Sequence, residues 1–351
     1  MRFSPLTRLA GVVGAIVIAL AATAAADAGG YVVKPLVSNN GVPGTLTDTN
    51  LVNAWGLVAG PTTPWWVADN GSNLSTLYTG AGARVNLVVN VGDAPTGIVF
   101  NNTTSFGLPA GGPARFLFDS EAGVISGWNG GADAQVFRDL SAAGAVFKGL
   151  AIATTRAGPR LFATDFRNSR IDVFAGNGQL LNEPFPAFRD FTISRFFAPF
   201  GIQAIGSRIY VTYAEKQFGS DDEADGPGLG YVDAYDASTG VLVARIATRG
   251  TLNAPWGIAL APQSFGPQSG DLLVGNFGDG RINAYRLTGS FFGGIPDGQL
   301  ADPLGDPISI DGLWALQFGN GAAAGPTSSL FFTAGPDDES NGLFGSITAS
   351  P

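Results

Sequence analysis

The stretches LFATDFRNSRIDVF (161–174) and LLVGNFGDGRINAY (272–285) share one pattern. Each begins with an apolar run that ends in Asp or Asn, passes through a short loop to Arg-Ile, and finishes as an alternating strand with an aromatic residue. Short alternating runs bounded by Gly, Asn and Asp predict two β-strands joined by a turn. Because the pattern recurs within one chain, it also predicts a repeat architecture.

A larger unit that contains this pattern occurs six times after residue 50. Each copy opens on a small-residue turn and an apolar strand, and the copies begin roughly 40–60 residues apart. The first strands are anchored at Trp55, Thr96, Lys148, Phe200, Trp256 and Trp314. Gly follows each anchor except the last, as expected where backbones crowd around a central channel. We therefore predict an all-β, six-bladed β-propeller with four-stranded antiparallel blades.

The sixth unit also predicts how the ring closes. It ends after its third strand, whereas the segment YVVKPLVS (31–38) belongs to no unit. Since a ring must cover its free sheet edges, we expect residues 31–38 to form the outer strand of the last blade. Fourth strands have the weakest signals, with the best candidates at 84–91, 134–137 and 242–247. Residues 101–113, 179–198 and 216–229 are typical of loop excursions.

The first 26 residues have the composition of a secretory signal peptide. Arg2 and Arg8 precede an apolar run at 9–22, and small residues before Asp27 offer cleavage sites. We expect residues 1–26 to be removed and residues 27–351 to form a single propeller domain, without a membrane span, in the periplasm or outside the cell. The alternative is that the N-terminal segment is retained as an anchor helix.

Composition narrows the classes of function. The net charge of −9 argues against nucleic acid as a partner, because an acidic protein repels phosphate backbones. The chain has no histidine, which excludes a Ser-His-Asp triad and histidine-ligated zinc. It has no cysteine either, so a bound metal would be a hard, oxygen-ligated ion such as Ca²⁺.

The repeats resemble those of NHL-type propellers. They are also similar to a bacterial family of secreted propellers of uncharacterised function, some of which have a C-terminal sorting tail. The segments that carry this resemblance include LVNAWGL (51–57), WVADNG (66–71), PTGIVFN (95–101), ATDFRNSRIDVF (163–174), APFGIQ (198–203), LNAPWGIALAP (252–262) and FFTAGPDDESNGLFG (331–345). The resemblance covers nearly the whole mature chain and implies a propeller and export, but no activity. The family often has His where this chain has Asn341, which argues against a catalytic histidine.

Candidate binding residues gather on one predicted face of the propeller. The start of each first strand and each loop between second and third strands should surround one mouth of the channel. Aromatic rings there would offer flat apolar area, and polar groups would orient a ligand. The candidates are Trp55, Lys148, Phe200, Trp256, Trp314, Asp69, Asp165, Arg170, Asn276 and Arg281. Alternatively, the tryptophans pack between blades, the Asp and Asn residues bond their own turns, and the arginines tie blades together.

A metal site is a weaker possibility in the same region. The candidate ligands are Asp221, Glu223, Asp225, Asp337, Asp338 and Glu339. The run from Asp221 to Gly226 resembles the start of a calcium loop, but its twelfth position is Val232 instead of Glu. A solvated acidic loop also explains this run.

These observations favour an exported binding or interaction module over an enzyme. Its ligand would be a small molecule, a glycan or a protein. One alternative is a calcium-dependent, lactonase-like hydrolase in which the ion polarises a carbonyl. The other is a structural protein of the envelope or matrix.

Overall fold

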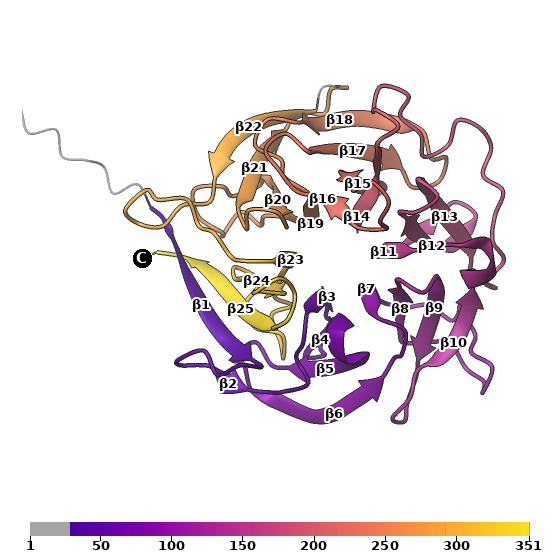
Figure 1. The fold of residues 1–351 in the computed structure, drawn as a ribbon, viewed down its shortest axis with the longest axis horizontal. Coiled ribbons are helices and arrows are strands. Elements are labelled where there is room, and N and C mark those ends of the chain that lie inside the picture. Colours follow the sequence, from indigo (N-terminus) through magenta and orange to yellow (C-terminus); the bar gives the residue numbers. More distant parts are fainter. Residues whose placement is uncertain (1–28, 292, 351) are drawn as a thin grey trace, which may run out of the picture.

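The structure is a computed structural model that describes residues 29–291 and 293–350, so the predicted signal peptide lies outside it. Six small sheets form a ring around a central axis, which confirms the six-bladed β-propeller (Figure 1). Apart from two short 3₁₀ turns, Asn70–Ser72 and Ser141–Ala143, the described residues form no helix. Accordingly, none of the described part of the chain forms a helix of the length and apolarity needed to cross a membrane.

Blades are numbered here in chain order, and their strands are given from the inside outward. Blade 1 contains β3 (Ala54–Val58), β4 (Trp65–Asp69), β5 (Leu74–Tyr78) and β6 (Arg84–Asn90). Blade 2 contains β7 (Pro95–Phe100), β8 (Phe116–Ser120), β9 (Val124–Trp128) and β10 (Gln135–Asp139). Blade 3 contains β11 (Phe147–Thr155), β12 (Gly158–Asp165) and β13 (Arg170–Ala175).

The other three blades follow the same plan. Blade 4 contains β14 (Phe197–Ile205), β15 (Arg208–Lys216), β17 (Gly230–Asp236) and β18 (Leu242–Thr248), and the short β16 (Glu223–Ala224) pairs with β15. Blade 5 contains β19 (Pro255–Leu260), β20 (Leu272–Asn276), β21 (Ile282–Leu287) and β22 (Gly294–Gln299). Blade 6 contains β23 (Leu313–Phe318), β24 (Leu330–Ala334), β25 (Leu343–Ala349) and β1 (Tyr31–Ser38), with β2 (Leu46–Thr47) outside β1.

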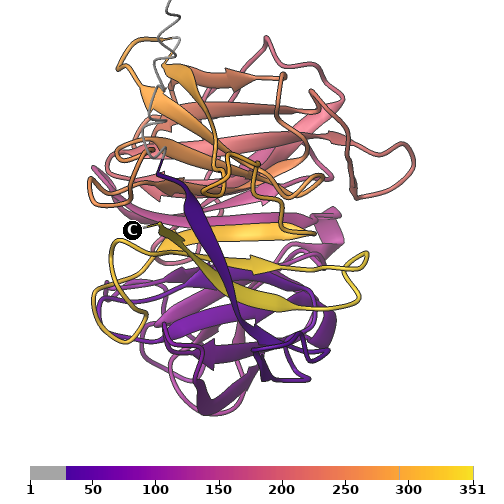
Figure 2. The same ribbon diagram turned by 90° about the vertical axis from the view of Figure 1, so that its left-hand side faces the viewer.

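The predicted closure of the ring is confirmed. β1 runs antiparallel to β25, from the pair Tyr31 and Ala349 to the pair Ser38 and Leu343. Figure 2 shows the indigo β1 lying along the yellow C-terminal strands. The buried Tyr31 hydroxyl also accepts a 3.0 Å hydrogen bond from the backbone N–H of Gln268, which joins the closing strand to blade 5.

Each inner strand is interrupted at its anchor residue. In all six blades the ladder between the first and second strands loses register across the anchor and the residue that follows it. The small residue at this break is required by close approach of the next blade. A Cβ on Gly201 would lie 2.1 Å from the carbonyl oxygen of Trp256, and one on Gly97 would lie 2.3 Å from the backbone nitrogen of Leu150.

The outer strands differ most from the prediction. The expected fourth strands correspond to β6, β10 and β18. The fourth strand β22 was not predicted, because its sequence GIPDGQ contains Gly, Pro and Asp residues that are typical of turns. Among the residues that the structure describes, none forms a fourth strand in blade 3. The excursion that follows β13 forms only an isolated bridge between Phe174 and Leu180 before it leaves the edge.

Gly201→Ala should destabilise the propeller. The added methyl group would meet the Trp256 carbonyl oxygen at 2.1 Å, so two inner strands must separate. We expect the free energy of unfolding to fall by roughly 1–3 kcal/mol, measured by urea denaturation. The control is Gly107→Ala, where a Cβ would meet nothing within 4 Å and stability should change by less than about 1 kcal/mol. Equal effects of the two substitutions would contradict the crowding argument.

Candidate functional site

Three tryptophans fill the mouth of the channel. Trp55 and Trp314 stack with ring centroids 3.7 Å apart, and Trp256 lies edge-on to both at 6.3 and 5.9 Å. All three side chains are buried and belong to one cluster with Phe200, which contacts the ring of Trp314. We call Trp55, Trp256 and Trp314 the tryptophan plug. Because the rings face one another, they leave little aromatic surface on which a ligand could stack.

Hydrogen bonds hold the plug in place. The indole N–H of Trp256 donates to the carbonyl oxygen of Lys148 at 2.7 Å, and that of Trp314 donates to Oδ1 of Asn53 at 2.9 Å. The Asn53 side chain in turn donates to Asn70, whose amide donates to Glu121 at 3.0 Å. A continuous polar chain therefore connects the plug to the charged groups above it. The sequence pattern places Asn70 on the predicted face of the channel mouth, whereas it gives no signal for Asn53.

Lys148 lies at the centre of those charged groups. Its Nζ lies 2.6 Å from Oε1 of Glu121, 3.5 Å from Oδ1 of Asp222 and 4.0 Å from Oε2 of Glu223. The side chain is only 2% exposed, and the ammonium lies 5.2 Å from the ring centroid of Trp55. Burial opposes the charged form, but the surrounding carboxylates outweigh it and raise the pKa of Lys148 above its ordinary value. The lysine is therefore a buried cation that is already paired.

The carboxylates around Lys148 come from three different blades and outnumber it. Glu121 follows β8, Asp222 and Glu223 belong to the acidic excursion of blade 4, and Glu339 precedes β25. Burial raises the pKa of Glu223 to about 7, although Lys148 opposes this, and burial also raises the pKa of Glu339. The predicted solvated loop at 216–229 thus folds over the channel mouth and contributes a buried carboxylic acid.

The metal-ligand candidates are not assembled into a cation site. Asp221 forms a salt bridge with Arg167, and Asp337 accepts a 2.7 Å hydrogen bond from the side chain of Asn341. Glu223 faces the ammonium of Lys148. Within residues 29–291 and 293–350, no group of three or more Asp or Glu side chains is arranged to hold a metal ion.

Two of the other candidate residues bond their own turns. Asp165 accepts a 2.7 Å hydrogen bond from the side chain of Asn168, and Asn276 donates to Asp279 at 3.0 Å. Asp69 is fully buried, and burial raises its pKa well above the ordinary value. Arg281 lies exposed at the surface of blade 5. The hydrogen bonds of Asp165 and Asn276 match the structural interpretation of the repeated Asp and Asn residues.

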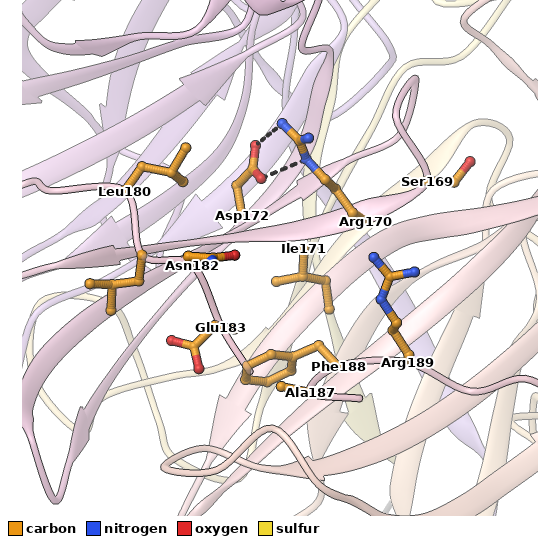
Figure 3. A pocket seen from close by; sticks show the side chains of 11 residues that line it. Ser169, Arg170, Ile171, Asp172, Leu180, Asn182, Glu183, Ala187, Phe188 and Arg189 are labelled. Carbon is orange, nitrogen blue, oxygen red and sulfur yellow. Dashed lines mark hydrogen bonds and ion pairs between the residues drawn. The ribbon is translucent and has the colours of Figure 1, made fainter. Parts of the chain in front are cut away.

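Arg170 lines a groove at the outer edge of blade 3, where a fourth strand would lie (Figure 3). The groove has a volume of about 350 Å³. One wall is residues 169–172, at the start of β13, and the other is formed by residues 180–183 and 187–189 of the following excursion. We call this cavity the blade 3 groove. The sequence pattern predicts the excursion but gives no signal that a strand is missing beside it.

The charges in the groove are mostly paired. Nε of Arg170 lies 2.7 Å from Oδ1 of Asp172, and Glu183 pairs with Arg160 at 3.0 Å. Phe188 is buried in the wall of the groove, whereas Arg189 is exposed. In the described part of the chain, Arg189 has no ion-pair partner, which leaves one cation at the groove without a counter-charge.

Relatives of the chain place it in a family of viral proteins. It is 34% identical over 331 residues to Uncharacterized protein R648 of Acanthamoeba polyphaga mimivirus, which covers 89% of this chain and 78% of the relative. Over 335 residues it is 32% identical to Uncharacterized protein L690 of the same virus, with coverage of 90% and 85%. The chain belongs to the family of these proteins. The bacterial origin that the sequence resemblance implied is corrected, because these relatives are viral, and no family model matches the chain.

Solved structures share the fold at low sequence identity. A catalytically inactive virginiamycin B lyase from Staphylococcus aureus, with quinupristin, has a TM-score of 0.50 and 12% identity, covering 91% of this chain and 99% of that chain. A protein of unknown function from Bacteroides thetaiotaomicron has a TM-score of 0.54 and 11% identity, with coverage of 91% and 76%. At these identities the similarity concerns the fold alone.

The pKa of Glu223 should make stability depend on pH. The folded protein keeps this proton up to about pH 7, whereas the unfolded chain loses it near the ordinary pKa of 4.5. Between these values the folded state binds more protons, so the free energy of unfolding falls as pH rises. Between pH 5 and 8 we expect the free energy of unfolding of the wild type to fall by up to about 3 kcal/mol more than that of Glu223→Gln, measured by urea denaturation.

Burial also raises the pKa values of Asp119 and Asp233 to about 7. These two groups therefore lower the free energy of unfolding with rising pH in the wild type and in Glu223→Gln alike. The difference between the two pH profiles therefore isolates Glu223. Parallel profiles would show that Glu223 ionises normally in the folded state.

Proposed function

We propose that the protein is an exported binding module that recognises a protein partner at the outer face of blade 3. The observation that carries this proposal is the blade 3 groove, a cavity of about 350 Å³ beside an excursion with exposed apolar side chains. Export is supported by the signal-peptide pattern of residues 1–26. A propeller scaffold suits this role because its rigid sheets hold surface loops in fixed positions.

The excursion beside the groove exposes unusually large apolar side chains. Leu180 is 43% exposed, Phe185 is 76% exposed and Phe191 is 68% exposed. The rings of Phe185 and Phe191 contact each other with centroids 5.5 Å apart, so they form a joint surface. Exposed apolar groups gathered beside polar ones are typical of protein interaction sites.

The channel mouth is a weaker candidate for the binding site. The plug buries the aromatic rings that would stack on a glycan or small molecule, and Lys148 is already paired with carboxylates. A lyase role is also less suited to this chain. The lyase of similar fold is inactive in a form with a histidine replaced by alanine, and this chain contains no histidine.

A pull-down with residues 27–351 as bait tests the proposal. The variant Phe185→Ser/Phe191→Ser removes the exposed rings, and the control Phe218→Ser removes a fully exposed ring from the acidic loop of blade 4. We expect proteins captured from the source organism by the wild type and by Phe218→Ser to be lost from the double variant. Identical capture by all three proteins, or no specific capture, would overturn the proposal.

A further inference from the structure

The structure points to a mode of binding at the blade 3 groove. We propose that the partner supplies an extended peptide segment that pairs with β13 as the missing fourth strand of blade 3, with an acidic side chain facing Arg189. This inference rests on the function proposed above and specifies the chemistry of the partner.

The outer edge of β13 is only partly used by the chain itself. The backbone N–H of Leu181 donates to the carbonyl oxygen of Val173 at 2.8 Å, and that of Ala175 donates to Gln179 at 2.9 Å. Main-chain groups alternate sides along a strand, so Val173 and Ile171 both direct theirs away from β12. Among the described residues, neither the N–H of Val173 nor the N–H and C=O of Ile171 has a partner on this side.

The other five blades cover the corresponding edge. Their third strands β5, β9, β17, β21 and β25 pair with β6, β10, β18, β22 and β1. In blade 3 the same position holds the groove, and residues 182, 183 and 187–189 of the excursion form the wall opposite β13 (Figure 3). The edge from Arg170 to Val173 is about 10 Å long at about 3.3 Å per residue. An incoming strand of four or so residues would thus complete the sheet by β-augmentation.

The groove also favours a peptide of a particular composition. Arg170 is held by Asp172 and Asp165, so it offers no full charge to a ligand. Arg189 is exposed on the opposite wall and has no ion-pair partner in residues 29–291 and 293–350. Because the chain is otherwise acidic, with a net charge of −9, this local cation would select an Asp or Glu side chain at close range. The apolar walls at Ile171 and Phe188 suit apolar neighbours on either side of it.

The test uses a phage-displayed library of random heptapeptides screened against residues 27–351, followed by fluorescence anisotropy with synthetic copies of the enriched peptides. We expect enrichment of an acidic residue flanked by β-branched or aromatic residues. Ile171→Pro removes the outward N–H, which has no partner within the described chain, and should weaken binding at least about tenfold. The matched control Ile171→Val keeps that N–H and should bind as the wild type does. Arg189→Glu should weaken the acidic peptides at least about tenfold and lower the salt dependence of binding.

Hydrogen exchange on the wild type provides a test that does not depend on the variants folding. The amides of residues 171 and 173 should exchange rapidly in the free protein and become protected by the enriched peptide. Protection confined to another region, equal affinity for Ile171→Pro and the wild type, or enrichment without acidic residues would overturn the inference.

Two further outcomes separate this inference from the proposed function. If Ile171→Pro still captures the partner that Phe185→Ser/Phe191→Ser loses, the protein binds through the apolar surface without strand pairing, and only the present inference fails. If sedimentation shows a wild-type dimer that Ile171→Pro abolishes, a second copy of this chain occupies the groove. The proposal of an acidic peptide from another partner is then wrong.

Discussion

The propeller depends on the contact between neighbouring inner strands at the residue after each anchor. There the ladder of each blade breaks, and the next blade approaches so closely that a methyl group at Gly56, Gly97, Gly201 or Gly257 would lie within 2.5 Å of its main chain. Threonines of the first and second strands use the space next to these breaks. Thr164 donates to the carbonyl oxygen of Phe200 at 2.7 Å, and Thr96 donates to that of Phe147 at 3.0 Å. Both bonds join one blade to the next, so crowding and hydrogen bonding act at the same breaks.

This crowding also explains where the tryptophans go. The breaks bring six anchor side chains to one narrow end of the ring, and three of them are indoles. Stacked rings fill such a space with large apolar area, while the N–H groups of Trp256 and Trp314 reach Lys148 and Asn53. A filled channel leaves little room for a ligand there, and the proposed binding site accordingly lies at the periphery, where blade 3 departs from the common plan.

The regular parts of the fold could be predicted from the sequence, because each depends on local pattern. Gly after Trp55 or Trp256 indicates an inner strand, and the unmatched segment 31–38 indicates the closing strand. The direction of the anchor rings could not be predicted. The alternation of apolar and polar residues along a strand does not distinguish rings that stack on one another from rings that line an open channel mouth. The positions of Asp222 and Glu223 over Lys148 depend on a long excursion from another blade. The missing strand of blade 3 was hidden for a similar reason, because residues 179–198 gave only the signal of a loop.

The closing pair of strands has a consequence for the order in which the molecule is assembled. β1 is the first described strand to be synthesised, and its partner β25 is the last. During elongation the five blades made from contiguous sequence can pair locally, while β1 has only the two-residue β2 as a local partner. The ring therefore completes only when the whole chain is available, and a nascent or truncated chain would present two open sheet edges to its surroundings.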